Sequence, residues 1–104
     1  MNNAEMIAKY DELVALQADL YSRARGAEGY AVVVGDRAVK VVLAGEGNNG
    51  YLAELRYASE LDANRAAEIA DNVGGVVVPC GMVWKAAADQ LGLAAEIYRN
   101  VIEN

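Results

Sequence analysis

The sequence predicts an α+β fold: an N-terminal helix, a three-stranded antiparallel meander, a helix, a short strand or extended segment, and a C-terminal helix. Two observations carry this prediction. Apolar residues recur at helical spacing near both ends of the chain, and runs rich in β-branched residues lie between them. We expect helices mostly on one face of the sheet. The chain has 104 residues, a common domain size, so we expect residues 1–104 to form one domain.

The first helix is predicted over residues 3–25. Its apolar residues recur at spacings of three and four and form one stripe: Met6, Tyr10, Leu13, Leu16 and Leu20. Gly26 follows a basic last turn, which is a typical helix end.

Residues 30–34 and 39–43 are rich in valine and flank Gly35-Asp36-Arg37, a pattern typical of a β-hairpin. Residues 31–34 read AVVV and are apolar at every position. We therefore expect a central strand that is covered on both faces or buried in a dimer.

Gly45, Gly47 and Gly50 spell G-x-G-x-x-G, the spacing of a dinucleotide-binding loop. Such a loop joins a strand directly to a helix, whose N-terminal amide groups hold the pyrophosphate. Here the preceding strand belongs to a hairpin, and Glu46 would repel a phosphate. We interpret the segment as a turn.

The next segment, YLAELRYAS, allows two interpretations. Tyr51, Ala53, Leu55 and Tyr57 alternate with more polar residues, which favours a third strand. The same segment is rich in good helix formers, so a helix is the alternative. We favour the strand because both tyrosines then share one face.

The C-terminal half is predicted to be mainly helical. Ser59 or Asp62 can cap a second helix, which ends at Gly74-Gly75. Residues 76–78 form a short buried strand or extended segment that ends at Pro79, and a last helix covers residues 81–102.

Composition bounds the function. The net charge is −6, which disfavours direct nucleic-acid binding, and no apolar run is long enough to span a membrane. The chain has no histidine, which removes the side chain most used for general acid–base catalysis, and we expect no enzyme activity, cofactor or metal. One cysteine excludes an internal disulfide and favours the cytoplasm.

These limits favour a non-catalytic, inhibitor-like protein-interaction module whose partner has a basic surface, such as a surface that normally binds nucleic acid. The candidate contact residues are three acids of the second helix and three tyrosines: Asp62, Glu68, Asp71, Tyr30, Tyr51 and Tyr57. A solvated helix face and ordinary tyrosine packing are the plainer interpretations of the same residues.

Two other functions stay open. A small-molecule pocket between sheet and helices would use Tyr30, Tyr51, Tyr57 or Trp84, with GEGNNG at its rim. An enzyme would use carboxylates or Cys80, a thiol at a helix start that is otherwise a small core residue. We also expect a homodimer, because residues 31–34 and the last helix offer more apolar surface than one chain covers.

Overall fold

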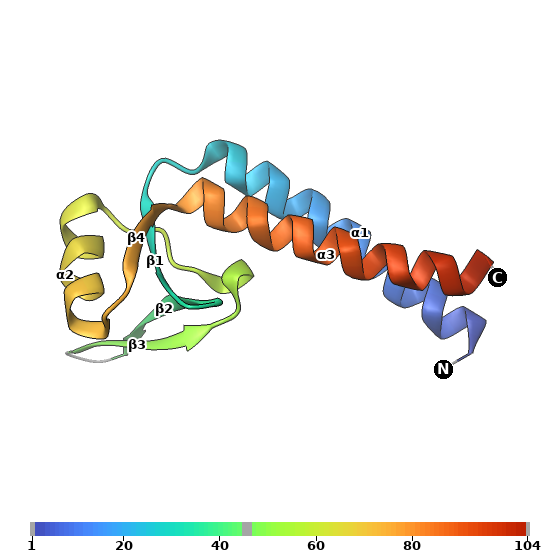
Figure 1. Ribbon diagram of the computed structural model, residues 1–104, viewed down its shortest axis with the longest axis horizontal. Coiled ribbons are helices and arrows are strands. Elements are labelled where there is room, and N and C mark those ends of the chain that lie inside the picture. The colour runs from blue at the N-terminus through green and yellow to red at the C-terminus, as the bar shows by residue number, and fades with distance from the viewer. Residues whose placement is uncertain (1, 45–46, 104) are drawn as a thin grey trace.

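The computed structural model describes residues 2–44 and 47–103, and the side chains of residues 2–42 and 50–103. Figure 1 shows the order of the elements, which confirms the predicted α+β class. They are α1 (Asn3–Gly26), β1 (Tyr30–Val34), β2 (Arg37–Ala44), β3 (Gly47–Ala53), the 3₁₀ turn η1 (Leu55–Tyr57), α2 (Ala63–Val73), β4 (Val76–Pro79) and α3 (Cys80–Glu103).

The four strands form one antiparallel sheet in the order β3-β2-β1-β4. As predicted for residues 31–34, β1 is a central strand covered on both faces, and Ala31 and Val32 are fully buried. Val32 packs with Ala66 and Ala70 of α2 on one face, while Ala31 packs against the first turn of α3 on the other. The expectation that the helices lie mostly on one face was therefore wrong.

The third strand differs from the prediction. β3 begins earlier, at Gly47, and ends at Ala53, after which the chain turns into η1. The cause is burial: Leu55 packs against the α1–α3 core, and the Trp84 Nε1–H donates to the Ala58 carbonyl at 3.3 Å. This segment tucks under α3 instead of continuing the strand, so Tyr51 and Tyr57 do not share a strand face.

The G-x-G-x-x-G segment does not lead from a strand into a helix. β2 and β3 pair antiparallel, from Ala38 opposite Ala53 to Ala44 opposite Gly47. Gly47 and Gly50, which were predicted to lie in a turn, lie within β3. Gly45 and Glu46 lie outside the described residues.

β4 is a strand, as one of the two alternatives predicted, but it is not buried. It pairs with β1 along one edge and forms one end of the sheet, so Val76 stays 64% exposed. Its apolar character resembles that of a central strand, and only the pairing order shows that it is an edge.

The caps of α2 settle another open choice. Asp62 is the N-cap, because its Oδ1 accepts from the Arg65 N–H at 2.8 Å. Ser59 has a different role: its Oγ accepts from the Val41 N–H at 2.9 Å and fixes the chain to β2. Gly74 ends the helix with a φ of 70°, a left-handed conformation that glycine adopts without strain.

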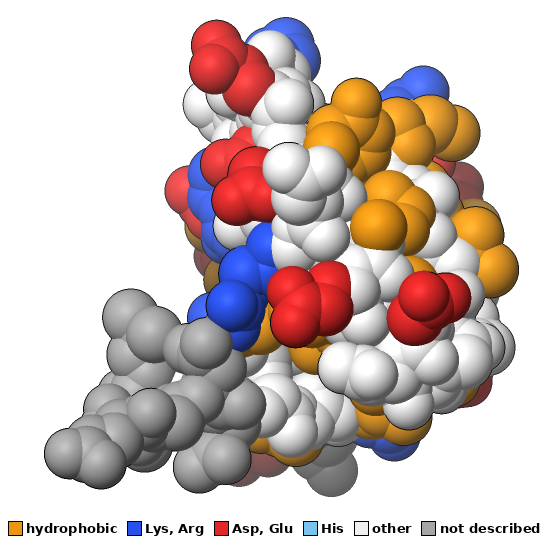
Figure 2. Space-filling view, turned by 90° about the vertical axis from the view of Figure 1, so that its left-hand side faces the viewer, with side chains coloured by type: hydrophobic (Ala, Val, Ile, Leu, Met, Phe, Trp, Pro, Cys, Tyr) orange, Lys and Arg blue, Asp and Glu red, His pale blue; other side chains and the backbone are white. Residues whose placement is uncertain are grey.

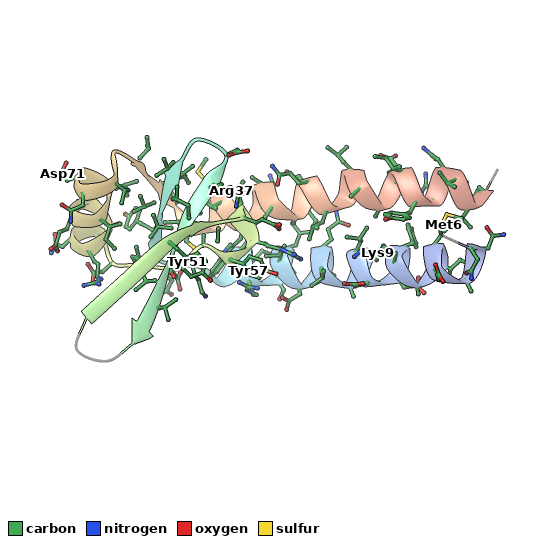
Figure 3. The ribbon with its side chains drawn as sticks, turned by 90° about the horizontal axis from the view of Figure 1, so that it is seen from below. Met6, Lys9, Arg37, Tyr51, Tyr57 and Asp71 are labelled. Carbon is green, nitrogen blue, oxygen red and sulfur yellow. The ribbon has the colours of Figure 1, made fainter. Side chains whose placement is uncertain are left out.

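Helices α1 and α3, of 24 residues each, form an antiparallel pair that projects from the sheet, and both chain ends lie at its far end (Figure 1). We call this pair the arm. Each helix turns one mainly apolar stripe toward the other; Leu13 and Leu20 of α1 are buried there, and Figure 3 shows Met6 on the side of α1 that faces α3. The stripe of α3 is Trp84, Ala88, Leu91, Ala95, Tyr98 and Ile102.

The junction between sheet and arm gives a direct stability test. A Cβ on Gly81 would lie 2.8 Å from the Ala24 carbonyl oxygen, which is backbone and cannot rotate away. Gly81→Ala should lower the free energy of unfolding by about 1–3 kcal/mol, as expected for overpacking. The measurement is urea unfolding followed by circular dichroism.

Gly26→Ala is the matched control, because a Cβ there meets nothing within 4 Å. We expect this variant to be neutral or slightly more stable, since alanine favours helices. Equal stability of the two variants would show that the α1–α3 approach is looser than described.

Candidate functional site

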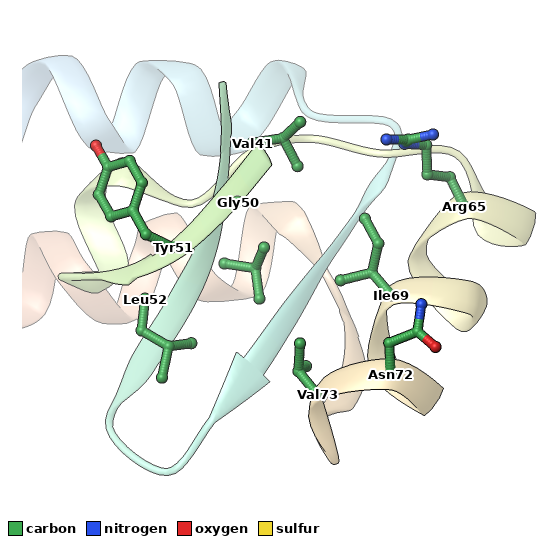
Figure 4. A pocket seen from close by; sticks show the side chains of 9 residues that line it. Val41, Gly50, Tyr51, Leu52, Arg65, Ile69, Asn72 and Val73 are labelled. Atoms are coloured by element: carbon green, nitrogen blue, oxygen red, sulfur yellow. The ribbon is translucent and has the colours of Figure 1, made fainter. Parts of the chain in front are cut away.

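An open groove lies between α2 and the β2–β3 hairpin and encloses about 300 Å³ (Figure 4). We call it the α2 groove. Its lining is mainly apolar and comes from three elements: Val39, Val41, Gly50, Tyr51, Leu52, Arg65, Ile69, Asn72 and Val73.

The groove exists because α2 covers the sheet unevenly. α2 packs over β1 and β4, while β3 at the opposite edge of the sheet extends beyond it. Leu52 stands opposite Val39, and Gly50 opposite Val41, so all four positions face the α2 side of the sheet. Gly50 has no side chain and therefore leaves its place in the groove lining, next to Val39 and the Lys40 carbonyl, unfilled.

Polar groups of the groove come mainly from α2. Figure 4 shows Arg65 at one end of the helix and Asn72 near the other, with Ile69 between them. Glu68 does not line the groove, but it is exposed and lies one helical turn from both Arg65 and Asn72, which do. Tyr51 contributes to the lining, but its ring points away from α2 (Figure 4).

The three candidate acids have different environments. Asp62 is engaged as the N-cap of α2, whereas Glu68 and Asp71 are exposed on that helix. Figure 2 shows that acidic side chains at this end of the molecule are interspersed with hydrophobic and basic ones. The structure therefore places no continuous acidic patch here: Glu68 lies one helical turn from the groove residues Arg65 and Asn72, and Asp71 points away from the groove.

The candidate tyrosines come from three elements. Tyr30 lies on β1 opposite Pro79, and its backbone also bridges to Leu61. Tyr57 is exposed on η1, where its ring lies 4.7 Å from the Arg56 guanidinium carbon. Of the three, the groove is lined by Tyr51 alone.

Trp84 also lies away from the groove. It packs within the junction of α3 with α1 and η1, and the guanidinium carbon of Arg23 lies 4.6 Å from its ring centroid. Its indole N–H is bonded to the Ala58 carbonyl, so the residue serves the core. Of the GEGNNG segment, Gly50 lines the groove, while Gly45 and Glu46 are outside the described residues.

Cys80 lies at the start of α3 and is fully buried in the core with Ala31 and Val83. Burial, assisted by the negative charge of Glu60, raises the pKa of the Cys80 thiol to about 11. The nearby Arg23 charge acts in the opposite direction but is the smaller effect. Because nucleophilic attack requires the thiolate, this position opposes thiol chemistry at neutral pH.

The sequence placed GEGNNG, which contains Gly50, at the rim of a pocket and named Tyr51 in it, but it did not indicate Leu52, Arg65, Ile69 and Asn72 as groove residues. Gly50 and Leu52 are two residues apart and therefore lie on one face of their strand, and the α2 residues recur at spacings of three and four and therefore share one side of the helix. Each of these two faces could be predicted from the sequence. Whether these two faces line one groove depends on which strands lie beside α2, and a pattern of neighbouring residues cannot predict this.

Comparison of the chain with known protein families, curated protein sequences and solved structures finds no significant match. Within residues 2–44 and 47–103, no helix has the length and apolar character needed to cross a membrane. The same described residues hold no group of three or more acidic or cysteine side chains placed to bind a metal ion.

The burial of Cys80 predicts slow chemistry. At pH 8, alkylation of the native protein by iodoacetamide should be at least ~100-fold slower than that of an unfolded peptide thiol. Mass spectrometry of timed samples measures this rate, with a urea-unfolded sample as the control. Rapid labelling of the native protein would show that the first turn of α3 opens readily.

The raised pKa also has a defined effect on stability. The native thiol keeps its proton between pH 9 and about 11, where the unfolded thiol loses it. Because the native state then binds more protons, stability should fall as pH rises through this window. Cys80→Ala should show a shallower fall in urea midpoint over the same range.

Proposed function

We propose that the protein is a non-catalytic, inhibitor-like interaction module of the cytoplasm that binds a protein with a basic surface through the α2 groove. The observation that supports this most is an open, mainly apolar groove, with the exposed Glu68 one helical turn from its lining residues Arg65 and Asn72. Apolar anchoring in a pocket, surrounded by complementary charge, is how protein interfaces obtain affinity and specificity.

The apolar part of the groove supplies the anchor. Leu52 and Val73 are large apolar residues that remain exposed at its edges, and Ile69 is partly buried between them. A partner side chain in the groove would cover all three and occupy the space above Gly50. This burial gives the contact its short-range energy.

Charge supplies the attraction. The chain carries 15 acidic and 9 basic side chains, so its net field favours a basic partner. Glu68 and Asp71 are the exposed acids within α2; neither lines the groove, and Glu68 is the nearer to its lining residues Arg65 and Asn72. Their effect should be largest on association rate and should weaken with salt, because both are exposed to solvent.

The charge component is tested by Glu68→Lys with Asp71→Lys. In affinity capture from nuclease-treated host lysate at ~50 mM salt, recovery of the specific partner should fall about tenfold or more. At ~300 mM salt the wild type and the variant should differ little, because the charges are screened. Equal recovery at both salt concentrations would remove the acidic contact from the proposal.

The groove component is tested by Gly50→Val, which places a side chain in the opening. A Cβ at Gly50 would lie 3.4 Å from both the Lys40 carbonyl oxygen and Val39 Cγ1, a distance of ordinary contact, so the fold should tolerate it. Partner capture should fall at least tenfold, since the anchor is excluded. Lys40→Thr is the control: it puts a β-branched residue on the opposite face of the hairpin and should leave the anchor site intact.

A small molecule is the second candidate occupant of the same groove. The volume of about 300 Å³ is at the lower end of small-molecule sites, and Arg65 and Asn72 supply polar groups among apolar walls. A compound screen by thermal shift separates the two functions. A ligand that raises the melting temperature of wild type but not of Gly50→Val, with no protein captured, would favour the small-molecule function.

A further inference from the structure

The outer side of α3 carries a second apolar stripe, which we call the outer stripe: Leu93, Ile97 and Val101. Their exposed fractions are 64%, 65% and 52%, although each is a large aliphatic residue. The spacing of four places them on one side of the helix, away from the stripe that contacts α1. A helix that is apolar on two opposite sides is typical of the interior of a bundle.

α1 continues this surface on its own flank. Ile7 and Val14 are exposed, and Val14 lines a hollow of about 460 Å³ together with Leu93. The hollow forms beside Gly92, which has no side chain and approaches Gln17 of α1. The arm therefore presents a projecting leucine directly next to a recess.

The shape of the molecule shows that the chain does not cover this surface itself. Its radius of gyration is 16.0 Å, whereas a compact chain of this length has one of about 13 Å. The difference comes from the arm, which extends away from the sheet in Figures 1 and 3.

We propose that the arm is a homodimerisation device: a second copy of this chain packs its own arm against the outer stripe, with the hollow at its Leu93 end, giving a four-helix bundle. Two arms supply four helices, and all have the same length of 24 residues. Leu93 and the recess at Gly92 lie on one face, so a two-fold axis sets the leucine of each copy in the recess of the other.

The available area fits a stable dimer. A 24-residue helix is about 36 Å long and about 10 Å across, so the two helices side by side offer roughly 700 Å² on one side of the arm. Stable interfaces bury about 800 Å² per partner. The outer stripe itself contains no charged residue, whereas the hollow beside Leu93 is also lined by Asp89, Glu96 and Arg99, which must pair with one another or stay at the solvated rim of the interface.

Edge pairing through β4 is the competing route to a dimer. Val76 is as exposed as Leu93, at 64%, and β4 pairs on one side with β1. However, β4 has four residues and ends in Pro79, which cannot donate a backbone hydrogen bond. Short strands that contain proline are a common way in which sheets prevent edge pairing.

The test is the mass of the full chain by light scattering and sedimentation equilibrium, from about 5 to 200 μM. Wild type should have twice the chain mass of 11.0 kDa. Ile97→Lys should weaken the dimer at least 30-fold and give a monomer through most of this range. Val76→Lys, which adds the same charge at a position of similar exposure, should remain a dimer.

Circular dichroism and Trp84 fluorescence report whether each variant is folded. If Ile97→Lys fails to fold, Leu93→Gln, a milder change at the recess, takes its place with the same expected loss of the dimer. A wild type that is monomeric throughout, a dimer that survives the substitutions in the arm, or a dimer that dissociates with Val76→Lys would each overturn the proposal. None of these outcomes depends on the occupant of the α2 groove, which lies at the other end of the molecule (Figure 3).

Discussion

The junction where β4 passes directly into α3 determines the rest of the architecture. No loop residue separates Pro79 from Cys80, and the Cys80 N–H donates to the Gly29 carbonyl at 3.0 Å. One residue later, Gly81 allows α3 to approach the backbone of Ala24 at the end of α1. The edge strand, the central strand and both arm helices are thus fixed at one point, and the direction of β4 sets the direction of the arm.

This arrangement divides the molecule into two parts that differ in how completely their apolar side chains are buried. Around the sheet, small residues such as Ala31, Ala38 and Ala66 are fully buried and allow close packing of helices on both faces. Along the arm, α1 and α3 pack against each other through their facing stripes and have little else to pack against. The exposed apolar residues of the arm are therefore a consequence of topology, and a helix pair that projects into solvent needs a further partner for them.

The sequence predicted those parts of the structure that depend on residues close together in the chain, and it failed where residues far apart in the chain meet. The helix, hairpin and cap patterns depend on neighbours within a few residues, and Asp62 and Gly74 were identified from such local chemistry. The end of β3 at Ala53 depends on the burial of Leu55 beneath α3, far along the chain, so alternation alone suggested a longer strand. The exposure of Val76 depends on strand order, which the sequence pattern does not contain. The sequence suggested a pocket between sheet and helices with GEGNNG at its rim, but not its α2 side, since Leu52 and Asn72 meet only through tertiary packing.

The two proposed surfaces are compatible because they lie at opposite ends of a molecule with a long axis of 49 Å. Pairing through the arm would leave both α2 grooves open, so a dimer would present two copies of the same site. Two linked sites bind a repeated or dimeric target with an avidity that can exceed the single-site affinity by about 10²–10⁴, provided that the spacing permits both contacts. The rigid junction at Cys80 and Gly81 would hold that spacing nearly constant, because the arm and the sheet share a buried core there. A small chain with one shallow groove of about 300 Å³ gains more from such duplication than from enlarging the groove, since the arm adds no contact to the partner and still raises the strength of binding.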